Sequence, residues 1–479
     1  MKKKSVYINT IGCQMNVYDT EQIIRALFTI GYRPVALMDK ADLIIVNTCA
    51  IREKAEQKAF SFLGRLAAMK RKNPGLIVGI GGCVAQQEGR KIFKRMPHVD
   101  LVFGTRAIGR LHHIIQQIES KKCRIVDVEI ENDRCDFISL NDINGNADLE
   151  NKSKFVTIMQ GCDNFCTYCV VPYVRGREIS RKPEDIINEI GKLVDSGVRE
   201  ITLLGQNVNS YGKKEGLCSF PELLSLVNDI EGLSRIRFTT SHPKDLSKEL
   251  ILAFNYLDKL CNHIHLPVQS GSNKILKKMN RKYTRELYIE NIEKLRHNCV
   301  DIAVTSDIIV GFPGETESDF EDTISLVNHV KFDGLFAFIY SDRPNAPAAG
   351  FLNKVPEKEK KERLQRLLDL QKIHTDKNNR ALTGSVEKVL VEGLSKMQCI
   401  GKSEKADGVQ EWTGRTSTNR IVNFIDPAFC NSGKESMHIA AGKMVDVKIE
   451  KAMAHSVWGK AVKTEPELIN SKGVKSYAA

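Results

Sequence analysis

Residues 154–169 read KFVTIMQGCDNFCTYC, an apolar run followed at once by three cysteines. The run ends at a glycine, which predicts a buried strand that opens into a loop. Cys162, Cys166 and Cys169 in that loop have a CxxxCxxC spacing, which differs from a zinc-ribbon pair and offers only three thiols. Because a closed structural metal site requires four ligands, the spacing predicts either a fourth ligand from elsewhere or a site that stays open.

This strand begins an alternation of strands and helices that continues to about residue 345. Five further apolar runs follow, with a helical segment before each: REITLLGQN at 199–207, RIRFTTSHP at 235–243, HIHLPVQSG at 263–271, DIAVTSDIIVGFPG at 301–314 and GLFAFIYS at 334–341. Six strand-and-helix units predict a partial (β/α)6 barrel related to the TIM barrel, with the active site at the carboxyl ends of its strands.

The rest of the chain divides around this α/β barrel. Apolar runs alternate with charged helical segments in residues 1–125, which predicts an N-terminal α/β domain with a parallel sheet. Short β-branched segments separated by glycines predict a small antiparallel β-barrel at 381–463. The other segments that we expect are a polar, acidic linker at 126–152, the partial (β/α)6 barrel at 153–350, a charged connector helix at 351–380 and a mobile tail at 464–479.

Composition narrows the class of protein. The 479 residues include 71 basic and 59 acidic side chains, a net charge of +12, which favours an anionic partner such as RNA. We find no signal peptide and no apolar run of the eighteen or so residues that a membrane helix needs, so we expect a cytoplasmic protein without a membrane partner. In the cytoplasm thiols stay reduced, and the 13 cysteines are therefore candidates for metal ligands or buried thiols rather than disulfides.

Three thiolates suit an iron-sulfur cubane that keeps one iron open to substrate. A zinc site at Cys162, Cys166 and Cys169 would need a further His or Cys, and none lies within a dozen residues. A second, dispersed set consists of Cys13, Cys49 and Cys83, each following a short apolar strand. Such cysteines would meet at one edge of a parallel sheet, so the pattern predicts a second cluster.

The CxxxCxxC loop after the first strand of a partial barrel resembles the radical S-adenosylmethionine enzymes. Two cysteine triads followed by a small β-barrel resemble the methylthiotransferases of that superfamily over nearly the whole chain. Within them, the stretches that look closest to the enzymes acting on isopentenylated adenosine in tRNA are GCQMNVYDTE, NTCAIREKAEQK, GCDNFCTYCVVPYVRGREISR and LLGQNVNSYG. One departure is Asn345 and Ala346 in YSDRPNAPAA, where the family commonly has Gly-Thr.

The resemblance implies the reaction and its cofactors. These are two 4Fe-4S clusters and S-adenosyl-L-methionine, used both as methyl donor and as radical source. The expected product carries a methylthio group on carbon 2 of N6-isopentenyladenosine at position 37 of tRNA, beside the anticodon. One cluster, on Cys13, Cys49 and Cys83, would hold the sulfur, and the other, on Cys162, Cys166 and Cys169, would serve radical formation. Other implied partners are a low-potential electron donor and an iron-sulfur or sulfur supply system.

The resemblance also suggests binding residues. Gln206 and Asn207 end the second barrel strand, where the family contacts the methionine part of the cosubstrate, and Ser270 and Arg281 are candidates for its ribose or carboxylate. The GFPGE segment at 311–315 is expected to shape the adenine pocket.

The C-terminal barrel resembles a TRAM domain, an RNA-binding module. Within GRTSTNR, residues 414–420, the candidates for RNA contacts are Arg415, Asn419 and Arg420. A solvated hairpin is an equally good interpretation of these three residues.

Two alternatives to this function remain at the level of sequence. One is a sibling methylthiotransferase that acts on threonylcarbamoyladenosine or on a ribosomal protein. The other, more remote, is a non-enzymatic, zinc-dependent RNA-binding protein.

Overall fold

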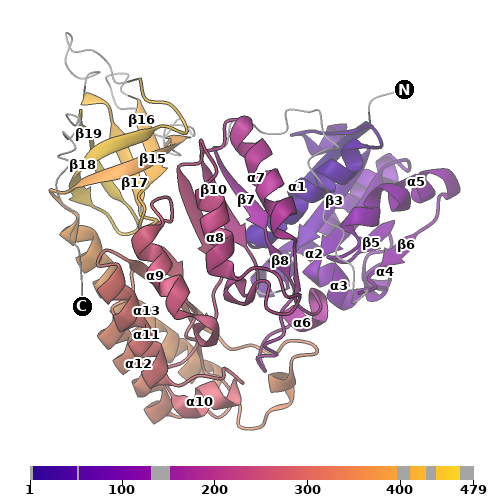
Figure 1. Cartoon of the computed structure of the whole chain (residues 1–479). Coiled ribbons are helices and arrows are strands. Elements are labelled where there is room, and N and C mark those ends of the chain that lie inside the picture. The colour runs from indigo at the N-terminus through magenta and orange to yellow at the C-terminus, as the bar shows by residue number, and fades with distance from the viewer. Residues whose placement is uncertain (1–3, 51–52, 131–151, 396–409, 428–437, 464–479) are drawn as a thin grey trace. The chain divides into compact units, whose positions relative to one another are not determined.

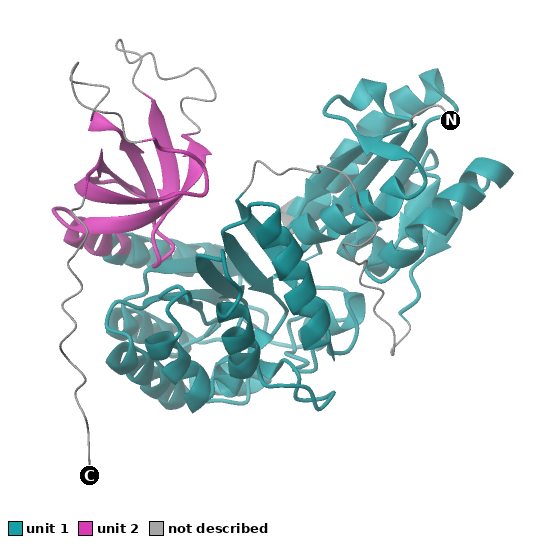
Figure 2. Cartoon of the chain, turned by 45° about the horizontal axis from the view of Figure 1, so that its top comes forward, with its two compact units in different colours: residues 1–374 teal, residues 375–479 magenta. Residues whose placement is uncertain are grey.

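The computed structural model describes residues 4–50, 53–130, 152–395, 410–427 and 438–463. The predicted tail at 464–479 and most of the predicted linker lie outside these ranges. The chain forms two compact units, residues 1–374 and 375–479 (Figure 2). None of the helices in the described ranges combines the length and apolar character needed to traverse a bilayer.

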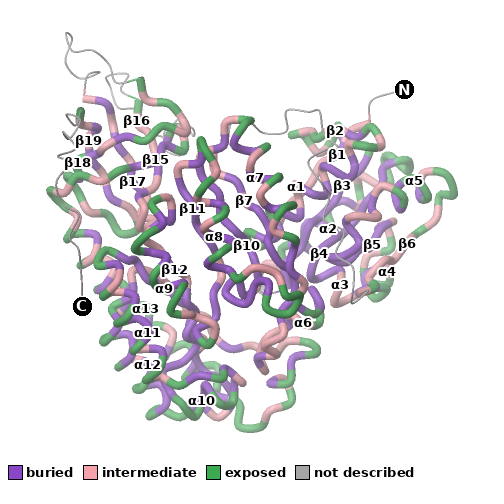
Figure 3. Tube along the Cα trace, in the orientation of Figure 1, coloured by how far each residue is buried: buried purple, intermediate pink, exposed green. Residues whose placement is uncertain are grey.

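The N-terminal domain is built on a six-stranded parallel sheet (Figure 1). Its strand order is β2-β1-β3-β4-β5-β6. The strands are β1 (Lys4–Ile11), β2 (Tyr32–Pro34), β3 (Leu43–Thr48), β4 (Ile77–Gly82), β5 (Leu101–Phe103) and β6 (Ile125–Asp127), and the α-helices are α1 (Gln14–Phe28), α2 (Glu53–Lys72), α3 (Cys83–Glu88), α4 (Lys91–Arg95) and α5 (Leu111–Lys121). Strands β3 and β4 are buried along their whole length (Figure 3), which explains the apolar runs LIIV and IVGI at their beginnings.

The parallel sheet is confirmed, but its edges differ from the expectation. Strands β2 and β6 were not foreseen, because these short strands lie at the two edges of the sheet and are only partly buried, so neither contains a run of buried apolar residues. Strand β6 pairs with β5 through Leu101 and Ile125, so the sheet continues into the first residues of the segment expected to be a linker. Helix α1 begins at Gln14, directly after Cys13.

The central domain contains the six expected parallel strands, arranged as two three-stranded sheets. An isolated parallel bridge joins Ile236 of β11 to Leu260, in the segment that leads into β12. The first sheet has the order β11-β10-β7, the second β12-β13-β14, and a short antiparallel pair, β8 and β9, flanks them. The strands are β7 (Ser153–Thr157), β8 (Met159–Gln160), β9 (Ile179–Ser180), β10 (Glu200–Leu204), β11 (Arg235–Thr239), β12 (His263–His265), β13 (Ala303–Val310) and β14 (Gly334–Ile339).

Helices follow the barrel strands along the chain, as a partial barrel requires (Figure 1). They are α6 (Val171–Val174), α7 (Pro183–Asp195), α8 (Phe220–Asn228), α9 (Lys248–Tyr256), α10 (Asn273–Lys278), α11 (Arg285–Asn298) and α12 (Glu317–Val330). Ser219, Ser247, Thr284 and Thr316 each cap one of these helices by accepting a hydrogen bond from a backbone N–H of its first turn.

The expected connector helix is α13 (Glu357–Ala381), and it does more than connect. Leu367 is fully buried in the core of the central domain, and Leu364 and Leu370 pack against the same core. The first turns of α13 therefore belong to the central domain, while its last residues fall in the second unit.

The second unit contains a closed five-stranded barrel of order β15-β16-β17-β19-β18. Its strands are β15 (Val386–Leu394), β16 (Glu411–Arg415), β17 (Ile421–Ile425), β18 (Met444–Ala452) and β19 (Val457–Ala461). Four of the pairings are antiparallel, but β17 and β19 pair in parallel. A ring with an odd number of strands cannot alternate direction throughout, so the small antiparallel barrel expected here contains this one parallel pairing.

Candidate active site

The N-terminal cysteines lie at one edge of the sheet because of its register. Strand β1 pairs Ile11 with Thr48 of β3, and β3 in turn pairs Thr48 with Gly82 of β4. Each of these strand ends is followed within two residues by one of the three cysteines, Cys13, Cys49 and Cys83. Cys49 and Cys83 are buried and Cys13 is half-buried.

A polar network holds these strand ends together, and sequence reasoning did not single it out. Asn16 of α1 donates from Nδ2 to Oδ1 of Asn47 (3.2 Å) and to the carbonyl of Thr48 (3.1 Å). Asn47 donates back to the carbonyl of Asn16 (2.8 Å), and the hydroxyl of Thr48 donates to Gly81 (2.6 Å). In the sequence, the signal for this network is the asparagine of GCQMN together with the asparagine and threonine of VNTC.

Gly82 is required at this edge for a steric reason. Its φ is +89°, and a Cβ at this position would lie 2.4 Å from the carbonyl oxygen of Thr48. Glycine therefore allows β4 to approach β3 closely just before Cys83.

The thiols of the N-terminal set interact with one another. A hydrogen bond with Cys49, together with the nearby charge of Arg175, lowers the pKa of Cys13 to about 6 despite burial. Burial raises the pKa of Cys83, and the charge of Arg175 opposes that rise. An arginine from the central domain thus faces thiols of the N-terminal domain.

The second triad lies in the loop between β8 and α6. The N–H of Cys162 donates to the carbonyl of Gly176 (3.2 Å), and the N–H of Cys169 donates to that of Cys166 (3.0 Å). Burial is the main cause that raises the pKa of Cys162 to about 11 and that of Cys169 to about 12, and the neighbouring thiol of Cys166 adds to both. The three thiols therefore lie close enough to influence one another's charge.

Arg281, one of the expected cosubstrate contacts, lies against this loop. It is buried and donates from Nη1 to the sulfur of Cys166 (3.5 Å) and from Nη2 to the carbonyl of Pro267 (2.6 Å). Next to it, Asn280 donates to the carbonyls of Asn164 (3.2 Å) and Phe165 (3.0 Å) inside the cysteine loop. The residues before α11 thus shape the loop that carries the second triad.

Each triad offers three thiols, the donor type that iron-sulfur clusters take. The part of the chain that the structure describes contains no group of three or more His, Cys, Asp or Glu side chains that could hold a single metal ion. Each triad also has a buried cation beside it, Arg175 or Arg281, which can balance the negative charge of a cluster.

One set of buried polar atoms without a hydrogen-bond partner in the described structure lies after the barrel strands. They are Oδ1 of Asn207, both amide atoms of Asn209, the hydroxyls of Thr240 and Ser241, Nε2 of His242 and Oε1 of Gln269. They follow β10, β11 and β12, at the carboxyl ends where a barrel binds its ligand. Such a set suits a polar ligand with several donors and acceptors, as S-adenosylmethionine is.

The expected cosubstrate residues differ in their surroundings. Gln206 accepts a hydrogen bond from the N–H of Gly161 (2.6 Å), directly before Cys162. Asn207 donates from Nδ2 to Asp245 (2.8 Å), and its oxygen is the unpartnered atom named above. Ser270 is buried, and its oxygen accepts from the N–H of Ser272 (3.2 Å).

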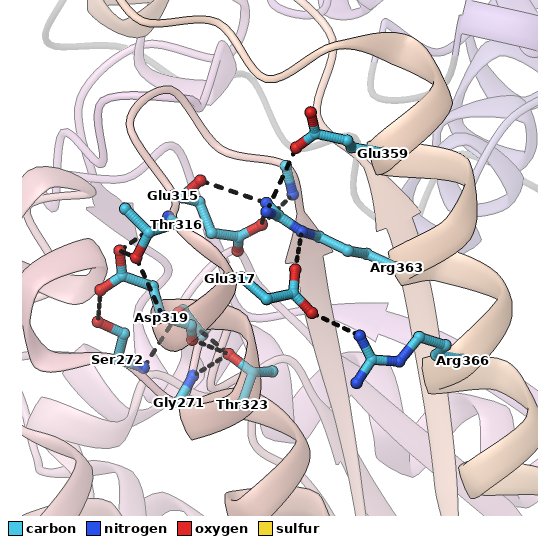
Figure 4. A network of polar contacts seen from close by, with 12 residues as sticks. Gly271, Ser272, Glu315, Thr316, Glu317, Asp319, Thr323, Glu359, Arg363 and Arg366 are labelled. Carbon is cyan, nitrogen blue, oxygen red and sulfur yellow. Dashed lines mark hydrogen bonds and ion pairs between the residues drawn. The ribbon is translucent and has the colours of Figure 1, made fainter.

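Figure 4 shows how α12 and α13 support the QSGS and GFPGE loops. The hydroxyl of Ser272 donates to Asp319 (2.7 Å), and the N–H of Gly271 donates to the hydroxyl of Thr323 (2.9 Å). Glu315 accepts from the N–H of Gly311 (2.6 Å) and from Arg363 of α13 (2.9 Å). Burial raises the pKa of Glu315 to about 7, although Gly311 and Arg363 oppose the rise.

The atypical Asn345–Ala346 pair fits its surroundings. Asn345 has φ +68°, a left-handed conformation that asparagine tolerates better than most residues. Ala346 is buried and packs in a core shared with Val170 and Val174.

The expected RNA contacts of the β16–β17 hairpin are engaged within the second unit. Arg415 donates to Glu392 (2.7 Å) and to Asn419 (3.2 Å), and Arg420 donates to Asn379 (2.6 Å). Arg415 and Arg420 are half-buried. The three residues thus have a structural role in the hairpin.

Comparisons with known proteins bear on both domains of the first unit. The family described as "Uncharacterized protein family UPF0004" matches residues 5–104, and the radical SAM superfamily matches residues 156–327. Among solved structures, a radical S-adenosylmethionine methyltransferase, TsrM, from Kitasatospora setae has a TM-score of 0.55 at 13% identity and covers 72% of this chain and 75% of its own. That likeness supports the fold.

Full-length relatives show the family. The tRNA-2-methylthio-N(6)-dimethylallyladenosine synthase of Desulfosudis oleivorans is 56% identical over 96% of this chain and 97% of its own length. The enzyme of the same name from Syntrophus aciditrophicus is 50% identical over 96% of this chain and 95% of its own length. The chain therefore belongs to the tRNA-2-methylthio-N(6)-dimethylallyladenosine synthase family of radical SAM enzymes.

Proposed function

We propose that this chain transfers a methylthio group to carbon 2 of N6-isopentenyladenosine beside the anticodon of tRNA. It would use two S-adenosylmethionine molecules and two 4Fe-4S clusters. The observation that carries the proposal is the presence of two cysteine triads, one at the strand ends of the N-terminal parallel sheet and one in the loop between β8 and α6, each beside a buried arginine.

The chemistry of the target explains why such cofactors are needed. The C–H bond at carbon 2 of an adenine ring is too weak an acid for a side-chain base, and bound S-adenosylmethionine with a reduced cluster supplies the homolytic chemistry it requires. In our proposal, Cys162, Cys166 and Cys169 hold one cluster, and Cys13, Cys49 and Cys83 hold the other.

The other residues of the chain bind and orient. Arg281 places a positive charge next to Cys166, and Gln206 holds the backbone in front of Cys162. The unpartnered polar atoms of Asn207, His242 and Gln269 would hydrogen bond the cosubstrate. The C-terminal barrel would bind tRNA, with Arg415 among its phosphate contacts.

Several partners follow from the proposal. Each turnover requires electrons from a low-potential donor, and the transferred sulfur must be replaced by a sulfur or iron-sulfur supply system. We place the reaction in the cytoplasm, together with its tRNA substrate.

Nucleoside mass spectrometry tests the function. A strain that lacks this modification and expresses the chain should regain methylthio-isopentenyl adenosine in its tRNA. The Cys162→Ala/Cys166→Ala/Cys169→Ala variant is the control and should not restore it. Recovery of methylthiolated threonylcarbamoyladenosine, or of a modified ribosomal protein, in its place would assign the chain to a sibling activity.

A further inference from the structure

Arg175 and Asp19 form a buried ion pair between the central and N-terminal domains of the first unit. Nη2 of Arg175 lies 2.6 Å from Oδ2 of Asp19, and the two side chains are 3% and 5% exposed. Asp19 belongs to α1, the helix that begins directly after Cys13. Removing both charges from water costs free energy, so a buried ion pair at this location indicates a functional role.

The guanidinium of Arg175 has a second donor that the ion pair does not use. Its Nη1 is buried and has no hydrogen-bond partner of normal geometry in the described structure. The guanidinium interacts with the thiol of Cys83 and influences the charge of Cys13. The spare donor is therefore in the neighbourhood of the N-terminal triad.

The backbone around Arg175 is held from both sides. Thr105 of the N-terminal domain donates to the carbonyl of Val174 (2.8 Å), and Arg106 donates to those of Arg175 (3.0 Å) and Arg177 (2.9 Å). The carbonyl of the intervening Gly176 accepts from the N–H of Cys162 (3.2 Å). Residues 174–177 thus touch the loop of one triad while the side chain of Arg175 reaches the other.

We propose that Arg175 is a positioning residue for the N-terminal cluster, with Nη1 donating to a sulfur of the cluster held by Cys13, Cys49 and Cys83. Asp19 holds the guanidinium in place, and residues 174–177 tie this contact to the Cys162 loop. A positive charge and a hydrogen bond at a cluster sulfur stabilise the reduced, more negative state. Arg175 therefore raises the reduction potential of this cluster and leaves that of the other unchanged.

The inference rests on the proposed two-cluster function, and redox titration followed by EPR tests it without tRNA. The full chain carrying Cys162→Ala/Cys166→Ala/Cys169→Ala retains only the N-terminal cluster. In this background Arg175→Gln should shift the potential to more negative values, and Arg175→Lys should shift it less. In the Cys13→Ala/Cys49→Ala/Cys83→Ala background, Arg175→Gln should cause no shift.

Arg181→Gln is the matched control, because Arg181 is also buried and is paired with Glu189 (2.7 Å). Equal potentials for Arg175→Gln and its parent background, or an equal shift in Arg181→Gln, would overturn the inference. Arg175→Gln could also fail to bind the N-terminal cluster at all. In that case, cluster binding by both Arg175→Lys and Arg181→Gln supports the inference, whereas loss of the cluster from all three variants overturns it. A failure here leaves the tRNA assay unaffected, since that assay reports the product and not the potential.

Discussion

Arg281 donates a hydrogen bond from Nη1 to the sulfur of Cys166, 3.5 Å away, although its Cα lies in a different loop 115 residues further along the chain. Its other partners in the described structure are the carbonyl of Pro267 and the phenol groups of Tyr168 and Tyr283. None of these carries a negative charge when the phenols are protonated. The arginine is thus a buried cation whose natural countercharge is a thiolate or an anionic cluster.

Replacing Arg281 by methionine should therefore reduce the stabilisation that a cluster provides. We expect reconstitution to raise the Tm of the parent more than that of Arg281→Met, by an amount corresponding to roughly 2–4 kcal/mol. Calorimetry of apo and reconstituted protein under anaerobic conditions measures this difference. Arg285→Met, on a half-buried arginine at the start of α11 whose hydrogen bonds in the described structure do not reach the cysteine loop, should leave the rise in Tm unchanged. An equal rise in all three proteins would contradict the role of Arg281.

Counting iron tests whether there are two clusters. The parent should contain about eight iron atoms per chain, and each alanine triple variant, of Cys13, Cys49 and Cys83 or of Cys162, Cys166 and Cys169, about four. The assay is anaerobic iron and acid-labile sulfide determination. A colourless protein that contains zinc would refute the iron-sulfur assignment.

Gly82→Ala should damage the N-terminal site selectively. The added Cβ would meet the backbone of Thr48, which cannot move without separating β3 from β4, so we expect a loss of about 3 kcal/mol in the free energy of unfolding and about half of the iron. Gly64→Ala is the control: it lies in α2, a Cβ there has no neighbour within 4 Å, and a gain of roughly 0.5–1 kcal/mol is expected. Full iron content in Gly82→Ala would show that the close approach is dispensable.

Glu178 should make stability depend on pH. Burial raises its pKa to about 7, although the hydroxyl of Ser210 donates to it. An acid whose pKa is higher in the folded state than in the unfolded state binds more protons when folded, so stability falls as pH rises from about 4.5 to about 7. Between pH 5 and pH 8, the free energy of unfolding of the parent should fall by about 2–3 kcal/mol more than that of Glu178→Gln. Denaturant unfolding at several pH values measures this difference. Parallel pH profiles for the two proteins would show that Glu178 titrates normally.

Arg415 should contribute to tRNA binding through charge. Its alanine variant is expected to bind tRNA more weakly and to lower the slope of log affinity against log salt by about 0.7–0.9, the value for one phosphate contact. Lys460→Ala removes one cation from the same barrel, where Lys460 pairs with Glu450 (3.1 Å), and serves as control. Identical slopes for Arg415→Ala and the parent would leave Arg415 with its structural role beside Glu392 alone.

The sequence predicted the repeating elements of the fold. The six barrel strands and the parallel N-terminal sheet follow from apolar runs that alternate with helical segments, and the C-terminal barrel follows from short β-branched segments separated by glycines. All of these patterns are local properties of the chain. The edge strands β2 and β6 were missed, because they are short and only partly buried. The parallel pairing of β17 with β19 follows from closing a ring of five strands, which no single strand encodes.

The sequence by itself determined which residues are cysteines, how they are spaced and that each triad follows a strand. Only the tertiary structure decided what surrounds them. Arg175 meets Asp19 across 156 residues, and Arg281 meets Cys166 across 115. Such pairs leave no periodic trace, because burial of a charge is favourable only where distant segments bring together a counterion and hydrogen-bond partners, and that is a property of the folded chain.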